Sequence, residues 1–331
     1  LSEAHEGNLR GMYVVGENPA LSEPDIQHAE VALEKLEFLV VQDIFMTETA
    51  THADVILPAA TSPEKHGTFT NTERRIQRVR ATATPPGMAR QDWEITQDLA
   101  SRLGYDWDYD HPGEIMDEIS DLTPIYGGVS YERLESGGEH GLQWPCWDED
   151  HPGTPYLYDY EDGEFNFDDG MARFVPADGG HPGELPDEEY PLTLTSGRVL
   201  YHWHTGQITR RVEGLMSHVS ESFVEISPST ADELGVADGE YVRVESRRGD
   251  IVVKATVTDR IGEGTLFIPM HFAAGAVNKL TQENFDPHTG IPEYKVSSVR
   301  VEPLGSDADP DVLRTPDAGV GSGDGTAASN D

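Results

Sequence analysis

Short hydrophobic runs alternate with polar turns in the first part of the chain. Residues 11–15 and 38–41 are apolar runs, and a third run over 53–57 ends at Pro58. Between the first two runs, residues 29–36 have the spacing of a short helix. Strands that alternate with helices are typical of a parallel sheet. We therefore predict a parallel α/β layer, in which ligands bind beyond the carboxyl ends of the strands.

Polar side chains follow the first two of these strands. Asn18 comes after the first strand, and Gln42 and Asp43 end the second. These positions lie where the α/β pattern predicts a binding edge. Residues 93–103 then read as an amphipathic helix, which Gly104 ends.

Residues 105–190 have a different composition from the rest of the chain. They are rich in Asp, Gly, Pro and Tyr and show little periodicity. We predict a long irregular segment that lies over other structure, with Trp144 and Trp147 as its anchors. A flexible linker is the alternative, although this density of aromatic residues argues against full disorder.

From Pro191 onward the pattern is that of short strands. One short helix is predicted among them, with Ser227 as its N-cap, Pro228 in its first turn and Gly235 at its end. The predicted strands are 192–195, 223–226, 241–245, 251–257, 264–269 and 294–301. Many short strands with one short helix indicate a closed β-barrel. The Gly, Ser, Asp and Ala residues after Pro303 predict a disordered acidic tail.

Composition excludes several classes of function. The chain has 61 Asp and Glu against 23 Lys and Arg, for a net charge of −38. No basic patch suits a phosphate backbone, so we expect no nucleic-acid partner. No apolar stretch is long enough for a membrane span. No secretory signal opens the chain, so we expect a cytoplasmic location, and because Leu1 is not Met we expect a beginning inside a larger gene product.

Cys146 is the only cysteine, and one thiol cannot hold an iron–sulfur cluster, a structural zinc or an internal disulfide. It lies between Pro145 and Trp147, and this apolar setting favours a packed thiol over a nucleophile.

The acidic residues are spread along the whole chain, and lysine is rare. Only Lys35, Lys65, Lys254, Lys279 and Lys295 are present. One interpretation is adaptation to high salt, where a Debye length of about 3 Å at 1 M mutes the repulsion between carboxylates. An ordinary acidic protein with disordered segments is the alternative.

The densest cluster of polar residues follows the first strand of the predicted barrel, over residues 195–206. Its Ser196-Gly197-Arg198 turn offers backbone N–H groups and a guanidinium, which together suit a phosphate. His202 and His204 would share a face of an extended segment, but a metal site would need a third ligand, and hydrogen-bonded packing is the alternative.

Three further residues are candidates for binding. Asn278 could pair with a nucleobase or pterin edge, and Lys65 could hold a carboxylate or a phosphate. Lys295 stands out because lysine is rare here. Each has a structural role as its alternative. No P-loop or Gly-x-Gly-x-x-Gly motif is present, and no catalytic triad can be argued from the order of residues.

Several motifs resemble those of the molybdopterin oxidoreductases of the dimethyl sulfoxide reductase superfamily. They occupy residues 13–19, 53–58, 71–75 and 197–206. Three others, at 128–134, 142–146 and 150–155, are similar to formate dehydrogenase alpha subunits in particular. The resemblance runs from about residue 10 to about residue 303. Assimilatory nitrate reductases carry similar blocks, so nitrate reduction stays open.

The resemblance implies a fold class of α/β plus β. Residues 1–120 would be the end of a parallel α/β domain and 121–186 an irregular connecting segment. Residues 187–303 would form a double-psi β-barrel that binds a dinucleotide, followed by a disordered acidic tail over 304–331. The implied cofactor is molybdenum or tungsten held by two molybdopterin guanine dinucleotides (bis-MGD), and the sequence does not choose between the metals.

The resemblance also assigns cofactor contacts, residue by residue. They are Asn18, Gln42, Asp43, Lys65, Asp92, Ser196, Gly197, Arg198, Val199, Leu200, Tyr201, His202, Trp203, His204, Thr205, Met270, Asn278 and Lys295.

Other family features are missing from this sequence. Relatives begin with a cysteine-rich segment for a [4Fe–4S] cluster, and they carry a cysteine or selenocysteine metal ligand and a His and Arg pair for formate. We therefore expect no catalytic and no metal-ligating residue here. We expect the carboxyl-terminal, cofactor-binding part of an enzyme that oxidises formate to CO₂. Its partner would be an amino-terminal segment or an iron–sulfur, electron-transfer subunit. A non-catalytic molybdopterin-binding module is the alternative.

Overall fold

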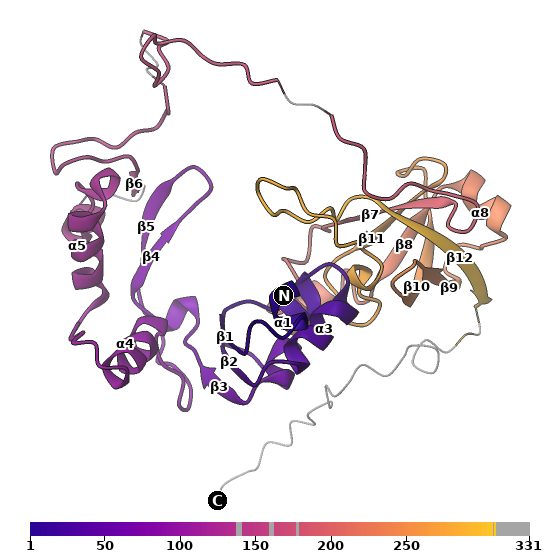
Figure 1. The fold of residues 1–331 in the computed structure, drawn as a ribbon, viewed down its shortest axis with the longest axis horizontal. Helices are drawn as coiled ribbons and strands as arrows, with labels where there is room; N and C mark the ends of the chain where they lie inside the picture. The colour runs from indigo at the N-terminus through magenta and orange to yellow at the C-terminus, as the bar shows by residue number, and fades with distance from the viewer. Residues whose placement is uncertain (137–140, 159–161, 177–178, 307, 309–331) are drawn as a thin grey trace, which may run out of the picture. The chain divides into compact units, whose positions relative to one another are not determined.

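The computed structural model describes residues 1–136, 141–158, 162–176, 179–306 and 308, which fall into two compact units (Figure 1). The barrel unit comprises residues 1–56 together with the chain from Gly180 onward. The helical unit comprises residues 57–179. The fold is thus mixed α/β with a closed barrel, as the sequence pattern predicts.

Residues 1–56 of the barrel unit form what we call the sheet layer. Its elements are α1 (Ser2–His5), β1 (Gly11–Val15), α2 (Pro19–Ser22), α3 (Ile26–Glu34), β2 (Phe38–Asp43), the 3-10 helix η1 (Thr49–His52) and the start of β3 (Val55–Pro58), a strand whose last two residues are counted with the helical unit. The strands lie in the order β1-β2-β3, and β1 runs parallel to β2. The alternation of strands and helices in the sequence therefore predicted this layer correctly.

The barrel closes around six strands. They are β7 (Leu192–Gly197), β8 (Phe223–Ile226), β9 (Tyr241–Glu245), β10 (Asp250–Val257), β11 (Thr265–Pro269) and β12 (Ser297–Gly305). They pair in the order β10-β8-β11-β7-β12-β9, and β9 pairs with β10 to close the ring. The β10–β8 and β11–β7 pairs are parallel, and the other pairs are antiparallel. Closure leaves no exposed sheet edge.

The barrel interior is filled by branched aliphatic side chains. Ile226, Val244, Val253 and Leu266 are fully buried in this core. Helix α8 (Pro228–Leu234) begins as predicted, because the Ser227 hydroxyl accepts the N–H of Thr230. It ends at Gly235, whose φ of 68° suits glycine. Two shorter 3-10 helices, η4 (Thr209–Arg211) and η5 (Val277–Lys279), and α7 (Glu213–Met216) lie in the connections.

The helical unit contains more regular structure than its sequence suggested. Its elements are η2 (Ser62–Glu64), β4 (Gly67–Thr70), β5 (Arg75–Val79), α4 (Asp92–Arg102), α5 (Pro112–Leu122), η3 (Pro124–Tyr126), α6 (Tyr131–Ser136) and β6 (Leu142–Gln143). Helix α4 matches the predicted amphipathic helix to within a residue at each end. The core includes Ile76, Met116 and the fully buried Cys146, whose sulfur is enclosed as expected of a packed thiol.

The prediction of an irregular segment from residue 105 was wrong for its first part, which holds α5 and α6. Helix α5 has a start signal in the sequence: His111 accepts the N–H of Gly113, Pro112 occupies the first turn and Glu114 completes a capping box. Trp144 is an anchor, since it packs against the core and stacks on Tyr126, whereas Trp147 is half exposed.

Two predictions concern the end of the chain and the membrane. Most of the predicted acidic tail lies outside the described residues, which end with 306 and 308. Among the helices that the structure describes, none is long and apolar enough to cross a membrane.

Candidate functional site

The loop after β7 is the centre of the candidate site. It runs from Gly197 to Gly206, and we call it the β7 loop. Ser196, the residue before it, is buried, and its hydroxyl donates to the carbonyl oxygen of Tyr294 at 2.7 Å. Lys295 Nζ donates to the carbonyl oxygen of Ser196 at 2.5 Å. The structure thus brings the two ends of the predicted barrel site together.

The ring of His271 is hydrogen-bonded to the backbone of the β7 loop at two positions. Its Nε2 accepts the backbone N–H of Val199 at 2.9 Å, and its Nδ1 lies 2.5 Å from the carbonyl oxygen of His204. A ring that accepts at Nε2 and donates at Nδ1 is the neutral tautomer. Burial lowers the pKa of His271, although its bond to His204 acts in the opposite direction. The loop is therefore fixed at two points by one uncharged ring.

Two glycines allow the close packing of this loop. A Cβ on Gly197 would lie 2.5 Å from the ring of Phe267. Gly206 has a φ of 75°, and a Cβ there would lie 2.5 Å from the carbonyl oxygen of His271. His204 itself has a φ of 48°, a conformation that is rare for a non-glycine residue. Such strain is common where a backbone approaches a ligand.

Arg198 within this loop and Lys295 next to it provide two positive charges. Burial lowers the pKa of Lys295, and the charge of Arg198 lowers it further. Within the described ranges neither side chain is paired with a carboxylate, although the chain has 61 acidic residues. Two unneutralised cations next to each other repel. The arrangement would be stabilised by an anion such as a phosphate.

The remaining loop residues divide into exposed and buried ones. Leu200 and Trp203 are largely exposed, whereas His202 and Thr205 are buried. His202 bonds to the Thr209 hydroxyl at 3.0 Å and to the Val219 carbonyl oxygen at 2.8 Å, so its ring is used in packing. Tyr201 stacks on His218. No cluster of three or more metal-ligating side chains occurs in the described part of the chain, so His202 and His204 gain no third ligand.

Two residues near the barrel rim contact α2 of the sheet layer. Asn278 is buried, and its amide donates to the carbonyl oxygens of Leu21 at 3.2 Å and Ser22 at 3.0 Å. The Tyr294 hydroxyl also donates to the Ser22 carbonyl oxygen. Met270 packs on the barrel core, and its N–H donates to the Gly197 carbonyl oxygen. Met270 therefore contacts the first residue of the β7 loop, whereas the side chain of Asn278 is engaged by the backbone of α2.

Glu48 connects the predicted sheet-layer site to the barrel. Its carboxylate accepts from Asn18 Nδ2 at 2.7 Å and from Arg210 Nη2 at 3.1 Å, and it also accepts from Gln207. Burial would raise the pKa of Glu48, but Arg210 and these hydrogen bonds outweigh it, so the pKa is lowered and the carboxylate stays charged. Asn18 is therefore engaged within the protein, because its Oδ1 also accepts from Thr49.

Gln42 and Asp43 lie at the carboxyl end of β2, as predicted. Gln42 is buried and accepts a hydrogen bond from the Tyr13 hydroxyl. Asp43 accepts the N–H of Phe45 at 3.1 Å. Burial raises the pKa of Asp43 despite these backbone contacts.

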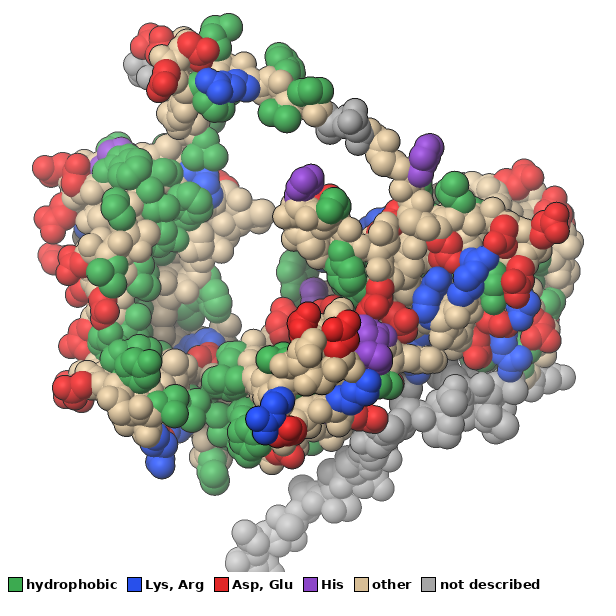
Figure 2. Space-filling model, in the orientation of Figure 1, with side chains coloured by type: hydrophobic (Ala, Val, Ile, Leu, Met, Phe, Trp, Pro, Cys, Tyr) green, Lys and Arg blue, Asp and Glu red, His purple; other side chains and the backbone are tan. Residues whose placement is uncertain are grey.

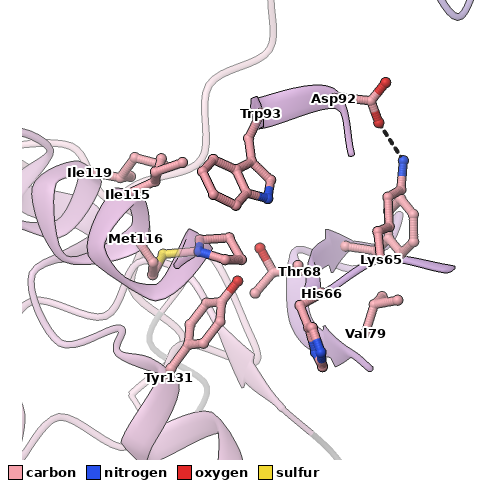
Figure 3. Close-up of a pocket in the computed structure, with 13 residues that line it drawn as sticks. Lys65, His66, Thr68, Val79, Asp92, Trp93, Ile115, Met116, Ile119 and Tyr131 are labelled. Carbon is pink, nitrogen blue, oxygen red and sulfur yellow. Dashed lines mark hydrogen bonds and ion pairs between the residues drawn. The ribbon is translucent and has the colours of Figure 1, made fainter. Parts of the chain in front are cut away.

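Lys65 and Asp92 belong to the helical unit. Lys65 Nζ lies 2.5 Å from an Asp92 oxygen, and the pair stands at the rim of a cavity of about 250 Å³ (Figure 3). Trp93, Met116 and Tyr131 line the cavity. The Trp93 indole nitrogen is buried without a hydrogen-bond partner in the described structure. These two predicted residues therefore pair with each other, within a different compact unit from the β7 loop.

The sequence did not single out Glu48 or Arg210. These residues are 162 positions apart, and neither lies in a motif of catalytic character. His271 was not among the predicted contacts either. Its hydrogen bonds to the loop depend on β11 pairing with β7, which local spacing does not reveal.

Comparison with known families identifies two parts of this chain. Residues 1–102 match the model of the Molybdopterin oxidoreductase family. Residues 192–298 match the model of the Molydopterin dinucleotide binding domain. The second match includes the β7 loop, Met270, Asn278 and Lys295.

Curated relatives carry formate dehydrogenase names. The chain is 46% identical to the F420-dependent formate dehydrogenase subunit alpha of Methanocaldococcus jannaschii, over 89% of this chain and 43% of the relative. It is 45% identical to the F420-dependent formate dehydrogenase 1 subunit alpha of Methanococcus maripaludis, over 92% of this chain and 44% of the relative. The chain thus spans less than half the length of these relatives.

Among solved structures, the acetylene hydratase of Pelobacter acetylenicus has a similar fold. The TM-score is 0.65 over 88% of this chain and 44% of the hydratase, at 19% identity. This likeness supports the fold and carries no further functional argument.

Proposed function

From the premise that this chain belongs to the molybdopterin oxidoreductases, we propose that it is the cofactor-binding part of a formate dehydrogenase-like enzyme. The observation that carries this proposal is the β7 loop with Arg198 and Lys295 beside it. Two cations without carboxylate partners suit the phosphates of a dinucleotide. The left-handed backbone at His204 supports the same proposal, because such strained positions are common at ligand-binding loops.

The residues present fit a pterin dinucleotide in charge and in hydrogen bonding. Arg198 and Lys295 would hold phosphate groups, and the exposed Trp203 and Leu200 would cover an apolar part of the ligand. We propose a bis-MGD cofactor with molybdenum or tungsten. When bound, the metal would accept the two electrons released as formate is oxidised to CO₂.

The other predicted contacts are part of the same proposal. On this account the sheet-layer residues Asn18, Gln42 and Asp43, and the Lys65–Asp92 pair, bind one of the dinucleotides. For Asn18 and Lys65, binding requires exchange of a present partner, Glu48 and Asp92 respectively. We also propose that the barrel is of the double-psi type, which its two parallel strand pairs support.

The wider enzyme is proposed from the names of the relatives. A metal ligand and a [4Fe–4S] centre would come from an amino-terminal segment or an electron-transfer subunit, and formate would be the small substrate. The domain division at residues 120, 186 and 303 and a cytoplasmic location remain proposals. Nitrate reduction is the alternative within the same family, and a non-catalytic molybdopterin-binding module is the alternative outside enzymes.

We also propose adaptation to high salt. Acidic side chains are visible on the surface of both units (Figure 2), and in most ion pairs of the described residues at least one of the two side chains is more than a third exposed. Screening by salt would reduce their repulsion. The unfolding midpoint should therefore rise between 0.1 and about 2 M KCl, whereas an ordinary acidic protein would show a small change.

The test of the cofactor proposal measures what the purified native protein contains. We expect molybdenum or tungsten by elemental analysis, and pterin and guanine nucleotide after acid release. Replacing Arg198→Ala together with Lys295→Ala should lower the pterin content strongly. Arg10→Ala is the matched control, because Arg10 is exposed and, among the residues that the structure describes, its ion pair is with the exposed Glu37. Equal pterin loss in both variants, or no pterin in the wild type, would contradict the proposal.

A further inference from the structure

Residues 180–190 lead into β7 (Figure 1), and we call them the strap. They belong to the barrel unit and follow the last residue of the helical unit in the sequence. The structure describes every residue of the strap, and none of them belongs to a helix or a strand. Such a segment has no ladder of backbone hydrogen bonds, so other contacts have to hold it in place. Two carboxylates, Glu184 and Glu293, connect the strap to residues close to Lys295.

Glu293 collects three hydrogen bonds on one oxygen. Its Oε2 accepts the backbone N–H of Gly183 at 2.9 Å, Gln282 Nε2 at 3.0 Å and Asn284 Nδ2 at 2.9 Å. Gly183 belongs to the strap, whereas the other two donors lie between η5 and β12. Hydrogen bonds to a charged acceptor are stronger than those between neutral groups. Glu293 therefore ties the strap to the chain two residues before Lys295.

The strap also approaches Asn284 too closely for a side chain at position 183. A Cβ on Gly183 would lie 2.7 Å from Asn284 Nδ2 and 3.0 Å from Asn284 Cβ. Glycine is the residue that permits such an approach of backbone to a neighbour. A larger residue would push Asn284 aside and break its hydrogen bond to Glu293. The contact between the strap and residues 282–293 is therefore close as well as polar.

Glu184 ties the strap to the chain on the other side of Lys295. Its side chain is 10% exposed, and its carboxylate pairs with Arg247 and with Arg248 Nη2, the latter at 2.9 Å. It also accepts the backbone N–H of Ser298 at 3.2 Å. Burial would raise the pKa of Glu184, but the hydrogen bonds from Arg248 and Ser298 outweigh it, so the pKa is lowered and the carboxylate stays charged. Ser298 lies at the start of β12, three residues after Lys295.

Lys295 thus lies between two points at which the strap is attached. Between these points, the same stretch of chain contacts the start of the β7 loop. Lys295 Nζ donates to the Ser196 carbonyl oxygen at 2.5 Å, and the Tyr294 carbonyl oxygen accepts the Ser196 hydroxyl at 2.7 Å. The position of Lys295 relative to the β7 loop therefore depends on Glu293 before it and on Ser298 after it.

We propose that the strap is a latch that positions Lys295 beside Arg198, and that Glu293 and Glu184 are its positioning residues. This inference rests on the proposed function, in which the two cations bind phosphate groups of a dinucleotide. Neither carboxylate would touch the ligand, because each acts through the backbone of the strap and of residues 293–298. A change in the strap would thereby alter the separation of the two cations without altering a residue that binds phosphate.

The end of the strap has contacts that do not involve residues 293–298. Asp187 accepts the N–H of Tyr190 at 2.9 Å and pairs with Arg247. Tyr190 is buried, and the Arg247 guanidinium lies 4.6 Å from the centre of its ring. These contacts keep the end of the strap on the barrel when Glu293 or Glu184 is replaced. Variants of the two carboxylates should therefore loosen the strap while the barrel stays folded, and denaturant unfolding of each variant checks this.

The ionisation of Lys295 reports its position. Burial lowers the pKa of Lys295, and the charge of Arg198 lowers it further. The chain has few lysines, so labelling with acetic anhydride followed by peptide mass spectrometry gives the pH profile of Lys295 separately. The full chain is produced in a host that makes no molybdopterin, so that no cofactor covers the lysine. We expect a wild-type midpoint below the ordinary lysine value of about 10.4.

Loss of the latch should raise this midpoint toward the ordinary value. In Glu293→Ala and in Glu184→Ala, Lys295 gains water and moves away from the guanidinium of Arg198. Glu293→Gln keeps an oxygen that can accept the same hydrogen bonds, so it should restore the wild-type midpoint. Glu188→Ala is the matched control, because Glu188 is an exposed carboxylate of the same strap whose side chain has no hydrogen bond or ion pair to the described residues.

The pterin content of the same variants, made in a host that supplies the cofactor, reports on the ligand. Glu293→Ala should lower the affinity for the cofactor about fivefold, as expected for the loss of one hydrogen-bonded contact, and this appears as pterin lost on dialysis. Glu188→Ala should retain the wild-type content. Gly183→Ala is a second route to the same result, because it displaces Asn284 from Glu293 and leaves every carboxylate in place.

Three outcomes overturn the inference. The first is an unchanged Lys295 midpoint in both Glu293→Ala and Gly183→Ala. The second is a shifted midpoint with full pterin content, because the lysine would then move without consequence for the ligand. The third is an equal shift in Glu293→Ala and Glu188→Ala, which would assign the effect to charge alone. A shifted midpoint in the variants, together with no pterin in the wild type, rejects the proposed function and leaves the positioning of Lys295 supported.

Discussion

The barrel and the sheet layer differ in how their strands are paired and in how their apolar side chains are buried. The barrel pairs each of its six strands on both sides, and its interior is filled by its own side chains. In the described part of the chain, the sheet layer has three strands with β1 and β3 at its edges, and its hydrophobic core packs on one face. The barrel therefore holds its site loop with its own contacts, whereas the sheet layer has apolar surface left to bury. Substitutions in the two regions should differ accordingly.

The largest effect is expected in the barrel interior. Ile226→Ala removes a fully buried side chain from a core with no other element to fill the space. We expect a loss of about 2–5 kcal/mol in the free energy of unfolding. Denaturant unfolding in concentrated salt measures it. A loss below about 1 kcal/mol would mean that the barrel core relaxes around the cavity.

The next effect concerns the link between the two regions. Glu48→Ala removes the partner of Arg210 and one partner of Asn18, and leaves a half-buried guanidinium without its carboxylate. We expect a loss of about 1–3 kcal/mol, less than for a fully buried pair because both side chains keep some contact with water. Because the pKa of Glu48 is lowered in the fold, its stabilisation is present above the unfolded pKa and is lost as the pH falls. The Glu48→Ala variant should therefore lose less stability than the wild type between pH 6 and about pH 3.

A smaller, pH-dependent effect is expected at His271, which is hydrogen-bonded to the β7 loop at two points. Burial lowers the pKa of His271, so the folded protein disfavours its protonation. Its contribution is full above the unfolded pKa of about 6.5 and is lost as the pH falls below that value. His271→Gln should cost about 1 kcal/mol at pH 8 and flatten the stability profile between pH 7 and about pH 5.5. Parallel profiles for the two proteins would exclude this role.

The smallest effect is expected at the exposed side chains of β1 and β2, which are those of Tyr13, Val15 and Phe38. Phe38→Ser should change the stability of the separate chain by less than about 0.5 kcal/mol, because the side chain is half exposed. Leu39→Ala, one residue along on the covered face, should cost about 2–5 kcal/mol. Thermal or denaturant unfolding of the pair measures the contrast. Similar losses in the two variants would show that Phe38 is buried within this chain.

Local sequence signals predicted the elements that local chemistry defines. Ser227, Pro228 and Gly235 fix the two ends of α8 through a hydroxyl, a restricted φ and a left-handed φ. The apolar runs of β1 and β2 and the strands of the barrel were visible for the same reason. Helix α5 was missed although His111, Pro112 and Glu114 form a start signal, because the surrounding Asp and Gly content obscured it.

The candidate site depends on contacts that no local pattern contains. Lys295 reaches Ser196 across 99 residues, and Arg210 reaches Glu48 across 162. The resemblance to a family assigned Ser196, Arg198 and Lys295 to one ligand, and the structure brings them together. The resemblance did not assign roles to His271 or Glu48, because these residues hold other residues in place through contacts of the tertiary fold.

The pairing of β7 with β12 has a consequence for synthesis. β7 lies between β11 and β12, so the β7 loop gains its last neighbour only when the end of the barrel has left the ribosome. Ser196 is made 99 residues before Lys295. At a translation rate of roughly 5–20 residues per second, Lys295 is therefore added about 5–20 seconds after the β7 loop has been synthesised. During that interval the nascent chain exposes an unclosed β-sheet, and on the proposed function a ligand that needs both cations binds only after Lys295 has been made.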